Sequence, residues 1–362
     1  RRIDIWGLLR LDPVLTSLLI AASLLGLIAL YSASGADLTM TLKQASSFAL
    51  GFGVMLVLAR ITPSSYAYVS PWFYGLGVIL LVAVALIGEV RMGAQRWIDI
   101  PGVTSVQPSE FLKLAMPMMA AWYLSTRPIP IRFRDLVVCV VMILVPVGLI
   151  AEQPDLGTSI LVFMSGFFVL FFAGLSWRLI GSMAALAAAA APIAWNFLHD
   201  YQRRRVITLF DPESDPLGNG WNIIQSKTAI GSGGLSGKGW LDGTQSHLHF
   251  LPEGHTDFII AAFSEEFGFI GVIVLLTLYL AILIRAIQIA TNAQTSYGRL
   301  LAGAITMSFF FYVFVNAGMV SGILPVVGVP LPFISYGGTA IITLMSGFGV
   351  LMSIQAHRKL MG

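Results

Sequence analysis

The sequence of 362 residues is short of charge, because only 11% of them are Asp, Glu, Lys or Arg, whereas 57% are hydrophobic. A water-soluble domain carries about 25% charged residues, so this composition excludes a soluble globular protein. The mean hydropathy of +0.83 also exceeds what a single membrane anchor would give. We therefore predict an all-α polytopic membrane protein, whose helices satisfy their own backbone hydrogen bonds within the bilayer.

Cysteine is nearly absent too. The one cysteine, Cys139, lies inside an apolar run, so no intrachain disulfide can form. We expect no cleaved signal, since the first apolar run is long enough to remain in the membrane as an anchor. The net charge of +3 says little by itself, and we expect no nucleic-acid partner. Residues 1–362 are predicted to form one transmembrane domain.

Ten apolar runs are candidate transmembrane helices. Several are shorter than the ~20 residues that a bilayer requires, so we expect them to extend into their polar flanks. Between the seventh and eighth runs lies a long polar loop, about residues 199–257. The ten runs cover residues 14–32, 44–59, 72–87, 111–124, 136–151, 158–175, 179–198, 267–284, 300–320 and 340–354.

The basic residues favour one orientation, with both termini in the cytoplasm. In this orientation only Asp4, Asp12 and Asp135 of the 18 carboxylates lie inside. The outer short loops and helix ends carry only Lys43, Arg91, Arg96 and Lys113. The inner face holds Arg1, Arg2, Arg10, Arg60, Arg127, Arg132, Arg134, Arg178, Arg285, Arg299, Arg358 and Lys359. We therefore predict a multi-pass protein of the inner (cytoplasmic) membrane, with its long loop facing the periplasm or cell exterior.

The outward loop restricts the chemistry that could take place there. Nucleoside triphosphates are absent outside the cell, so we expect no nucleotide cofactor and a substrate that arrives already activated. The glycine-rich stretch 231–239 resembles a phosphate-binding loop but lacks its first glycine and its final Ser or Thr. Either its backbone amides cradle a phosphate, or it is a flexible turn after a helix at about residues 221–230.

Polar residues recur at the outer helix ends. In Gln107-Pro-Ser-Glu110 and Gln153-Pro-Asp155, a proline precedes a Ser or Asp that is predicted to cap the next helix. Glu110 and Lys113 are three residues apart, so they share a helix face and can pair. These residues are either caps and an interfacial ion pair or the lining of a polar cavity, which is the usual place of ionisable residues at membrane depth.

Arginines near the outer surface are candidates for binding a phosphate. Arg96 precedes Trp97, which suits the membrane interface, and could either bind a lipid phosphate or anchor to headgroups. The run Arg203-Arg-Arg205 follows the seventh span, where three cations require anionic partners.

Asp257 is placed in the first turn of the eighth helix, near the outer interface. One interpretation is a carboxylate that complements the helix dipole. Glu265 and Glu266 lie two turns deeper, which favours a second interpretation, a charged cavity lined by carboxylates and arginines. Near the other end of the chain, Gly322–Tyr336 is apolar but rich in Pro and Gly, so it cannot be a regular helix and must pack against protein or lie in the interface.

Several of these stretches resemble the SEDS family (shape, elongation, division, sporulation). The resemblance covers essentially the whole chain without a plain departure from the family motifs. Gly243-Thr-Gln-Ser246, before Phe250-Leu-Pro-Glu, looks more like the elongation branch than the division branch. The matching stretches are Ala94-Gln-Arg-Trp97, Gln107-Pro-Ser-Glu110, Gln153-Pro-Asp-Leu-Gly-Thr-Ser159, Ile230-Gly-Ser-Gly-Gly-Leu235, Leu251-Pro-Glu-Gly-His-Thr-Asp-Phe258, Asn316, Gly322-Ile-Leu-Pro325, Gly328 and Ser335-Tyr-Gly-Gly-Thr-Ala340.

The resemblance implies a peptidoglycan glycosyltransferase that polymerises lipid II at the outer face of the membrane. It also implies partners: a class B penicillin-binding protein transpeptidase, other membrane proteins of the elongation complex, and membrane lipids. The family's catalytic aspartate falls on Asp257, and its Glu/Lys pair falls on Glu110 and Lys113. The other residues expected to bind substrate or support the site are Gln107, Arg96, Asp155, Arg205, Lys227, His255, Thr256 and Ser335.

The role of Asp257 is open at the level of sequence. It is either a general base whose pKa is raised by desolvation and by Glu253, Glu265 and Glu266, or a ligand of a divalent cation, Mg or Mn, that neutralises pyrophosphate. A lipid II flippase is the main alternative function, and a scaffold for other wall proteins is a third. The concentration of carboxylates on the outer side favours the enzyme, because a flippase needs polar groups within reach of both faces.

Overall fold

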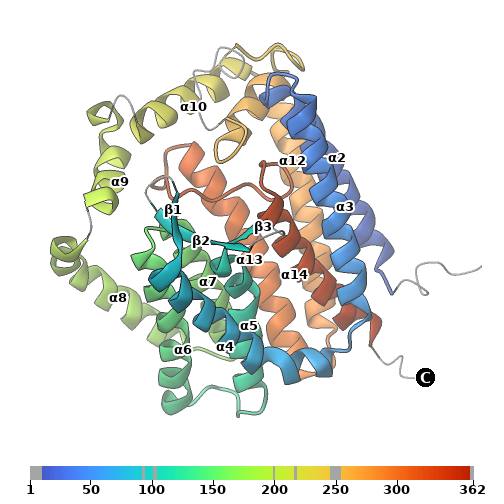
Figure 1. Cartoon of the computed structure of the whole chain (residues 1–362), viewed down its shortest axis with the longest axis vertical. Coiled ribbons are helices and arrows are strands. Elements are labelled where there is room, and N and C mark those ends of the chain that lie inside the picture. The colour runs from blue at the N-terminus through green and yellow to red at the C-terminus, as the bar shows by residue number, and fades with distance from the viewer. Residues whose placement is uncertain are drawn as a thin grey trace, which may run out of the picture.

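The computed structural model describes residues 10–91, 94–100, 104–198, 200–215, 218–244 and 254–358. Within these residues ten helices have at least 17 residues, and each overlaps one of the ten predicted spans (Figure 1). The prediction of an all-α polytopic membrane protein is confirmed. The ten helices are α2 (Pro13–Ala33), α3 (Leu38–Arg60), α4 (Pro63–Ile87), α5 (Pro108–Ser125), α6 (Phe133–Glu152), α7 (Leu156–Phe172), α8 (Trp177–Ala194), α12 (Ile259–Thr291), α13 (Ser296–Val320) and α14 (Gly338–Ala356).

Eight of these helices are long and apolar enough to cross a membrane by themselves. The other two are α7, which is apolar but has 17 residues, and α5, which is less apolar because it carries Glu110 and Lys113. Most helices extend beyond the apolar runs into polar flanks, as expected. For example, α3 begins after Asp37, whose side chain caps it by accepting from the backbone N–H groups of Thr39 and Met40.

The two ends of the described chain meet at one end of the helix bundle. Arg10 Nη1 lies 2.6 Å from His357 Nε2 and donates to the backbone oxygen of Arg60 at 3.3 Å. We call this end the terminal face and the opposite end, which carries α9 and α10, the loop face (Figure 1). Ten helices cross the membrane an even number of times, so the two ends of the chain lie on the same side. Four of the charged residues on which the predicted orientation depends lie outside the described residues, namely Arg1, Arg2, Asp4 and Lys359.

Helices α13 and α14 run through the centre of the bundle, where most of their residues are buried. After α13 the chain returns through residues 321–337 without forming a helix. Val329, Leu331, Phe333 and Ile334 in this segment are fully buried, as expected for irregular backbone at membrane depth. The prediction that this stretch is not helical and packs against protein is confirmed.

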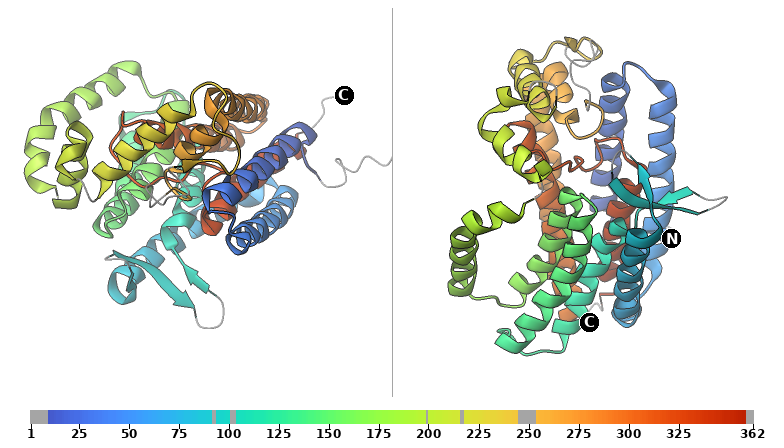
Figure 2. Two further views of the ribbon diagram at one scale, coloured as in Figure 1. Left: turned by 90° about the horizontal axis from the view of Figure 1, so that it is seen from above. Right: turned by 60° about the vertical axis from the view of Figure 1, so that its left-hand side comes forward.

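A small antiparallel sheet lies between α4 and α5 and was not predicted. It consists of β1 (Glu89–Arg91), β2 (Ala94–Ile100) and β3 (Thr104–Val106), with β2 in the middle. Trp97 pairs with Glu89, and Ile98 pairs with Val106. The sheet projects beside the helices in Figure 2. Two of its strands have only three residues, which is too short for an alternating pattern to be recognised in the sequence.

The predicted long loop at about 199–257 is partly helical. It contains α9 (Asp200–Phe210), the 3-10 helix η2 (Pro212–Ser214) and α10 (Asn219–Gly233). Together with α8, which has no buried residue, these segments form an arc that stands away from the bundle on one side (Figures 1 and 2). The arc returns to the bundle where α10 packs against α12 and α13.

The glycine-rich stretch packs against a kink in α12. Gly268 has φ 64° and ψ −166°, a conformation that favours glycine, so a segment at 259–267 precedes the long helix that spans the membrane. Phe269 N donates to Gly234 O at 2.9 Å, and Lys238 N donates to Glu265 O at 3.0 Å. The amides of 237–239 are used by the protein itself, so the structure supports a packing role for these glycines rather than a phosphate cradle.

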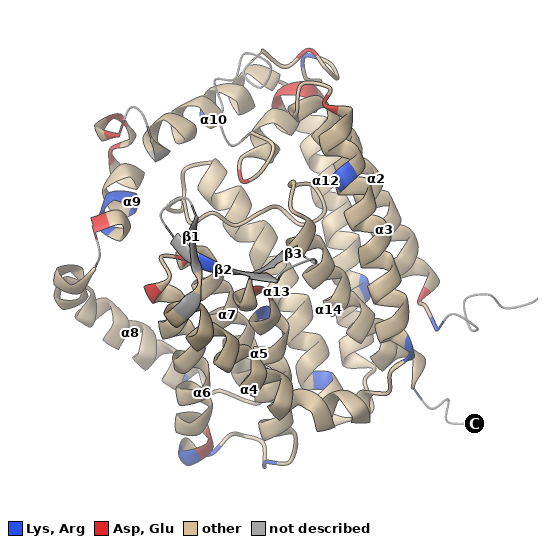
Figure 3. Cartoon of the chain, viewed as in Figure 1, with Lys and Arg blue, Asp and Glu red and all other residues tan. Residues whose placement is uncertain are grey.

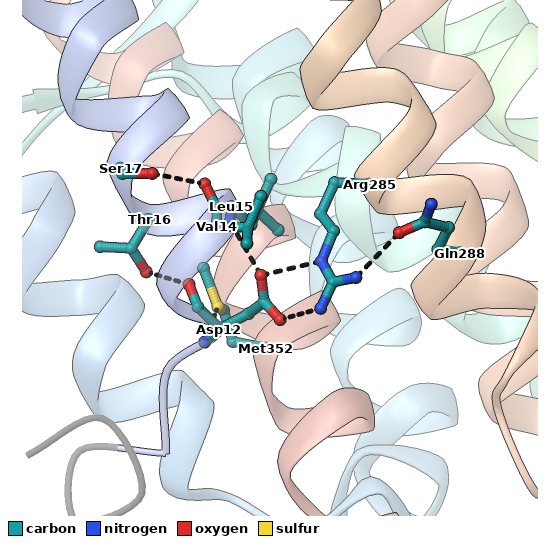
Figure 4. A network of polar contacts seen from close by, with 8 residues as sticks. All are labelled: Asp12, Val14, Leu15, Thr16, Ser17, Arg285, Gln288 and Met352. Atoms are coloured by element: carbon teal, nitrogen blue, oxygen red, sulfur yellow. Dashed lines mark hydrogen bonds and ion pairs between the residues drawn. The ribbon is translucent and has the colours of Figure 1, made fainter. Parts of the chain in front are cut away.

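An ion pair joins the first and eighth spans at the terminal face (Figure 4). Arg285 Nε and Nη2 donate to the two carboxylate oxygens of Asp12 at 3.0 and 2.5 Å, and Leu15 N donates to Asp12 Oδ1 at 2.8 Å. Burial alone would raise the pKa of Asp12, but the hydrogen bonds and charge of Arg285 and the backbone N–H groups of Leu15 and Val14 outweigh it and lower the pKa.

We predict that Asp12→Asn lowers the free energy of unfolding by about 2 kcal/mol, because charge-assisted bonds to Arg285 are lost. A lowered folded-state pKa stabilises the protein above the unfolded pKa of about 3.9, so the difference between the two proteins should shrink as the pH falls below about 4. Thermal unfolding in detergent measures this. Asp37→Asn is the matched control, because Asp37 also caps a helix but has no ion pair in the described chain. Equal effects of the two substitutions would contradict the prediction.

Candidate active site

Asp257 lies in a turn at the loop face, residues 254–258, immediately before α12 begins at Ile259. The sequence placed it within the first turn of this helix, which is wrong by two residues, because the turn continues to Phe258, the N-cap position, and the helix begins only at Ile259. Asp257 is partly exposed, while Phe258 and Ile259 beside it are fully buried. The aspartate is therefore fixed by its neighbours but accessible to a ligand.

The returning segment 321–337 holds this turn through backbone contacts. Ser335 Oγ donates to Thr256 O at 2.7 Å, and Tyr336 N donates to His255 O at 3.0 Å. The rings of His255 and Tyr336 are 6.5 Å apart. The predicted site residues His255, Thr256 and Ser335 therefore take part in the contacts that hold the backbone of this turn in place.

Gly328 permits the closest approach to the carboxylate. Its φ is 74°, and a Cβ atom added there would lie 3.3 Å from Asp257 Oδ2. A side chain at this position would therefore be strained and would crowd the carboxylate. The glycine keeps the space beside Asp257 open.

Asn316 connects the turn at 254–258 to the returning segment. Its Nδ2 donates to Asp257 O at 2.8 Å and to Val329 O at 2.7 Å, and its side chain is fully buried. Asn316 belongs to the family motif in the sequence, but the motif alone predicts no role for it. A buried amide in an apolar helix was the available signal, since such a group needs partners.

We predict that Asn316→Ala lowers the turnover of whatever reaction Asp257 takes part in by about 10- to 100-fold, because a misplaced reacting group loses rate steeply. Asn316→Asp should be at least as damaging, since it has the same shape but places an oxygen against two carbonyl oxygens. Steady-state kinetics should show the loss mainly in kcat rather than KM. Ser321→Ala is the control, because Ser321 Oγ bonds only to its own helix. Full activity of Asn316→Asp would exclude a positioning role.

The start of α7 lies against the same segment. A Cβ atom on Gly157 would fall 2.5 Å from Val327 O, so the two backbones are in direct contact. Asp155 caps α7 by accepting from Thr158 N at 3.2 Å, and Gln107 Nε2 donates to its other oxygen at 2.9 Å. The predicted residues Asp155 and Gln107 are thus paired with each other, and the cap predicted for Asp155 is confirmed.

The cap predicted for Ser109 is wrong. Helix α5 begins at Pro108, its N-cap position is Gln107, and no side chain caps it. The proline occupies the first helical position itself, which leaves Ser109 inside the helix. Ser109 Oγ is buried without a hydrogen-bond partner among the described residues.

Arg96 reaches from β2 to the connection between α6 and α7. Its Nε donates to Gln153 O at 3.0 Å, and its Nη2 donates to Pro154 O. The sequence offered a phosphate-binding arginine or a headgroup anchor at this position. In the structure these N–H groups hold the loop that presents Asp155, so Arg96 has a positioning role whatever else it binds.

Arg205 is the arginine of α9 that faces the site. Its Nη1 is buried without a hydrogen-bond partner among the described residues. The pKa of its guanidinium is lowered, chiefly by burial and also by the charge of Arg96. The charges of Tyr201, Asp155 and Asp257 act in the opposite direction and raise it. These groups therefore lie within electrostatic range of Arg205, which has a donor available for an anion.

Glu110 and Lys113 form a buried ion pair one turn inside α5. Lys113 Nζ is 2.5 Å from Glu110 Oε1, and the side chains are only 7% and 12% exposed. Lys113 also lies over the ring of Tyr312, 5.6 Å from its centroid, and within electrostatic range of Asp155. The predicted pair is confirmed as an ion pair. Tyr312 had no signal in the sequence, where it is one aromatic residue in an apolar run.

Two sets of predicted residues contact other parts of the chain. Lys227, on α10, covers the beginning of the returning segment, because a Cβ atom on Gly322 would be 2.7 Å from its Nζ. Glu265 accepts from Lys238 Nζ at 2.6 Å, and Glu266 accepts from Ser32 Oγ at 2.5 Å. Both glutamates are buried, and these bonds fix the loop after α10 and the end of α2, so the structure gives them a packing role, and their place in a cavity around Asp257 stays a prediction.

The predicted metal site finds limited support in the donor set. The part of the chain that the structure describes contains no group of three or more His, Cys, Asp or Glu side chains able to hold a metal ion. Glu253, which was expected to affect Asp257, lies outside the described residues, as do His247 and His249. A cation near Asp257 would need oxygen ligands from the substrate.

The chain is similar to known bacterial proteins over nearly its whole length. A family model for cell cycle proteins of the FtsW/RodA/SpoVE type matches residues 12–360. Peptidoglycan glycosyltransferase MrdB of Escherichia coli K12 is 53% identical over 357 residues, 98% of this chain and 96% of that protein. A probable peptidoglycan glycosyltransferase FtsW of Geobacter sulfurreducens is 36% identical and covers 97% of this chain and 96% of its own length.

Solved structures share the fold. A chain of a peptidoglycan synthase complex that coordinates polymerization and crosslinking matches with a TM-score of 0.85 at 32% identity, covering 97% of this chain and 99% of its own. The crystal structure of the rod shape determining protein RodA of Thermus thermophilus matches with a TM-score of 0.72 at 29% identity, covering 96% and 97%.

Proposed function

This chain belongs to the FtsW/RodA/SpoVE family of cell cycle proteins and is a peptidoglycan glycosyltransferase, and we propose that it polymerises lipid II with Asp257 as the general base. The single observation that supports this role is the position of Asp257. It is an accessible carboxylate in a turn held by buried contacts, and it lies within the electrostatic range of Arg205.

The proposed reaction joins two lipid-linked disaccharide units. The 4-hydroxyl of one unit gives its proton to the Asp257 carboxylate and attacks the anomeric carbon of the growing chain. The bond from that carbon to the pyrophosphate breaks, and the lipid pyrophosphate leaves with the bonding electrons. Arg205 supplies a free N–H donor for the developing negative charge, while Arg96 adds positive charge nearby.

An apolar groove is available for the lipid part of a substrate. It has a volume of about 410 Å³, lies between α3, α4, α5 and α14, and is lined mainly by apolar residues, with Glu110 and the hydroxyl residues Ser65, Thr343 and Ser346 among them. A groove of this kind suits a hydrocarbon chain whose charged headgroup lies toward the ion pair. It supports a lipid-linked substrate rather than a soluble sugar.

The proposed active site faces the periplasm or cell exterior. The terminal face carries Arg10, Arg60, Arg285 and Arg299, and basic residues are enriched on the cytoplasmic side of membrane proteins. Figure 3 shows charged residues at the two ends of the bundle, on α9 and near the small sheet, with long uncharged stretches along most helices. This orientation exposes Asp257 to substrate delivered to the outer leaflet.

The partner is a class B penicillin-binding protein transpeptidase, in keeping with the related chain that belongs to a synthase complex for polymerization and crosslinking. We propose that this partner regulates polymerisation by reshaping the loop face. The arc from α8 to α10 stands away from the bundle and carries Arg205, so its displacement would change the charge near Asp257. Equal activity of the lone protein and the complex would refute this.

A divalent cation, Mg or Mn, is proposed only as a bridge between Asp257 and the pyrophosphate of the substrate. Ions of this kind are commonly held by one or two carboxylates together with substrate phosphates. Such an ion would supply positive charge to the leaving group. Removal of divalent ions by a chelator, followed by addition of Mg or Mn, tests the requirement directly.

Purified complex in detergent, supplied with labelled lipid II, tests the proposed function. We expect glycan ladders on gels, because polymerisation needs no sealed membrane. A flippase would move lipid II across vesicle membranes without forming ladders. Transport in vesicles together with the absence of polymer in detergent would overturn the proposal.

A further inference from the structure

Gln44 is a fully buried amide near the beginning of α3, a helix that contributes no other group to the proposed site. A buried amide in an apolar environment needs hydrogen-bond partners. Its Nε2 donates to Ser335 O at 2.9 Å, and its Oε1 accepts from Gly337 N at 3.2 Å. One side chain of α3 therefore holds the end of the returning segment 321–337 at two points.

The two partners fix how the amide of Gln44 is oriented. The carbonyl oxygen of Ser335 can only accept a hydrogen bond, and the backbone N–H of Gly337 can only donate one. Gly337 is also the N-cap position of α14, so the second bond lies where the returning segment becomes a helix. A side chain here must carry a donor and an acceptor next to each other, as glutamine does.

Helix α3 is a firm base for this contact. It packs along α14 (Figure 1). A Cβ atom on Gly338 would lie 2.9 Å from Ser47 Oγ, and one on Gly51 would lie 3.0 Å from Met345 Cγ. The two helices are therefore in close contact over more than one turn, and the end of the returning segment cannot move relative to α3 without disturbing this packing.

The returning segment passes this hold on to the turn at 254–258. Ser335 Oγ donates to Thr256 O at 2.7 Å, and Tyr336 N donates to His255 O at 3.0 Å. These are the two residues of the segment between which the bonds of the α3 amide fall. A shift of the segment would therefore displace the residues that precede the proposed base.

We propose that Gln44 is a positioning residue for glycosyl transfer, whose bond to Ser335 O holds the returning segment where it keeps the Asp257 carboxylate in place. This inference rests on the proposed function of Asp257. Because Gln44 is fully buried, it touches no substrate, and its loss should lower turnover rather than weaken substrate binding. A displacement of about 1 Å at a reacting group can cost about 100-fold in rate.

Two variants of opposite charge separate the two bonds. Gln44→Lys keeps a donor for Ser335 O and loses the acceptor, whereas Gln44→Glu keeps an acceptor for Gly337 N and loses the donor. Each buries a charge, so each controls for that cost in the other. Gln44→Met has nearly the same length without either group. Steady-state kinetics of glycan formation by the purified complex, with labelled lipid II at neutral pH, compares them.

We expect Gln44→Glu and Gln44→Met to lower kcat by about 10- to 100-fold, with KM changed less than about threefold. Gln44→Lys should keep kcat within about threefold of the unmodified protein. Ser165→Ala is the control for a buried polar group, because Ser165 Oγ bonds only within α7, and its kcat should be unchanged. Thermal unfolding in detergent shows which variants remain folded.

A double variant tests whether Gln44 acts through Ser335. Ser335→Ala breaks the next link toward Asp257, so Gln44→Met/Ser335→Ala should be about as slow as the slower single variant instead of showing the product of both losses. Multiplicative losses, equal losses in Gln44→Lys and Gln44→Glu, or a kcat of Gln44→Met equal to that of Ser165→Ala would each overturn the inference. Absence of glycan from the unmodified complex would instead overturn the proposed function.

Discussion

Asp257→Asn is expected to lower lipid II polymerisation by about 10²- to 10⁴-fold, the range typical of a lost general base. The amide has the shape of the carboxylate but cannot accept the proton of the attacking hydroxyl. The fold should be unchanged, because the backbone oxygen of Asp257, rather than its carboxylate, accepts the hydrogen bond from Asn316. The measurement is the rate of glycan formation by purified complex with labelled lipid II.

The control for this substitution is Asp211→Asn. Asp211 is an exposed carboxylate of the loop face whose side chain caps no helix, so its loss changes the net charge equally without touching the turn at 254–258. Its activity should equal that of the unmodified protein. If Asp257→Asn formed ladders at the same rate as Asp211→Asn, Asp257 could not be the base or an essential metal ligand.

Lys113→Met is expected to destabilise the protein by about 3–5 kcal/mol, because it leaves the Glu110 carboxylate buried without its partner. The two charged groups are 2.5 Å apart and both side chains are little exposed. Loss of either side chain therefore leaves the other as an uncompensated charge with little access to water. Glu110→Gln should be destabilising for the same reason. Thermal unfolding in detergent compares the variants, with Lys43→Met, an exposed lysine of α3, as the control.

The double variant Glu110→Gln/Lys113→Met distinguishes a structural pair from a functional one. It leaves no unpaired charge, so most of the lost stability should return. We expect polymerisation to remain at least about tenfold reduced, because Lys113 lies within electrostatic range of Asp155 and contributes positive charge near the substrate phosphates. Recovery of full activity with full stability would restrict the pair to a structural role.

Local patterns were sufficient to predict the class of fold. A run of apolar residues can satisfy its backbone only as a helix in the bilayer, so ten runs predicted ten helices, and each has a counterpart in the structure. Asp155 was predicted as a cap because capping depends on residues three positions apart. The sheet at 89–106 escaped prediction because its strands are stabilised by pairing with one another and not by a recognisable run.

The candidate site was only partly predictable. Charged residues at membrane depth drew attention to Glu110, Lys113 and Asp257, because such residues need a compensating environment. Composition could not show that Glu265 and Glu266 bond to the loop after α10 and the end of α2. Similarly, the position of Arg96 suggested a phosphate site, while its hydrogen bonds hold the backbone at Gln153.

By itself, the sequence determined that this protein spans the membrane, how many times the apolar pattern repeats, and which short segments carry ionisable groups, since each property depends on neighbours in the chain. The tertiary structure alone decided how Asp257 is held. Asn316 is 59 residues from Asp257, and Gly157 contacts Val327, which comes 170 residues after it in the chain. Such contacts depend on how helices pack, and residues so far apart leave no periodic pattern from which their meeting could be read.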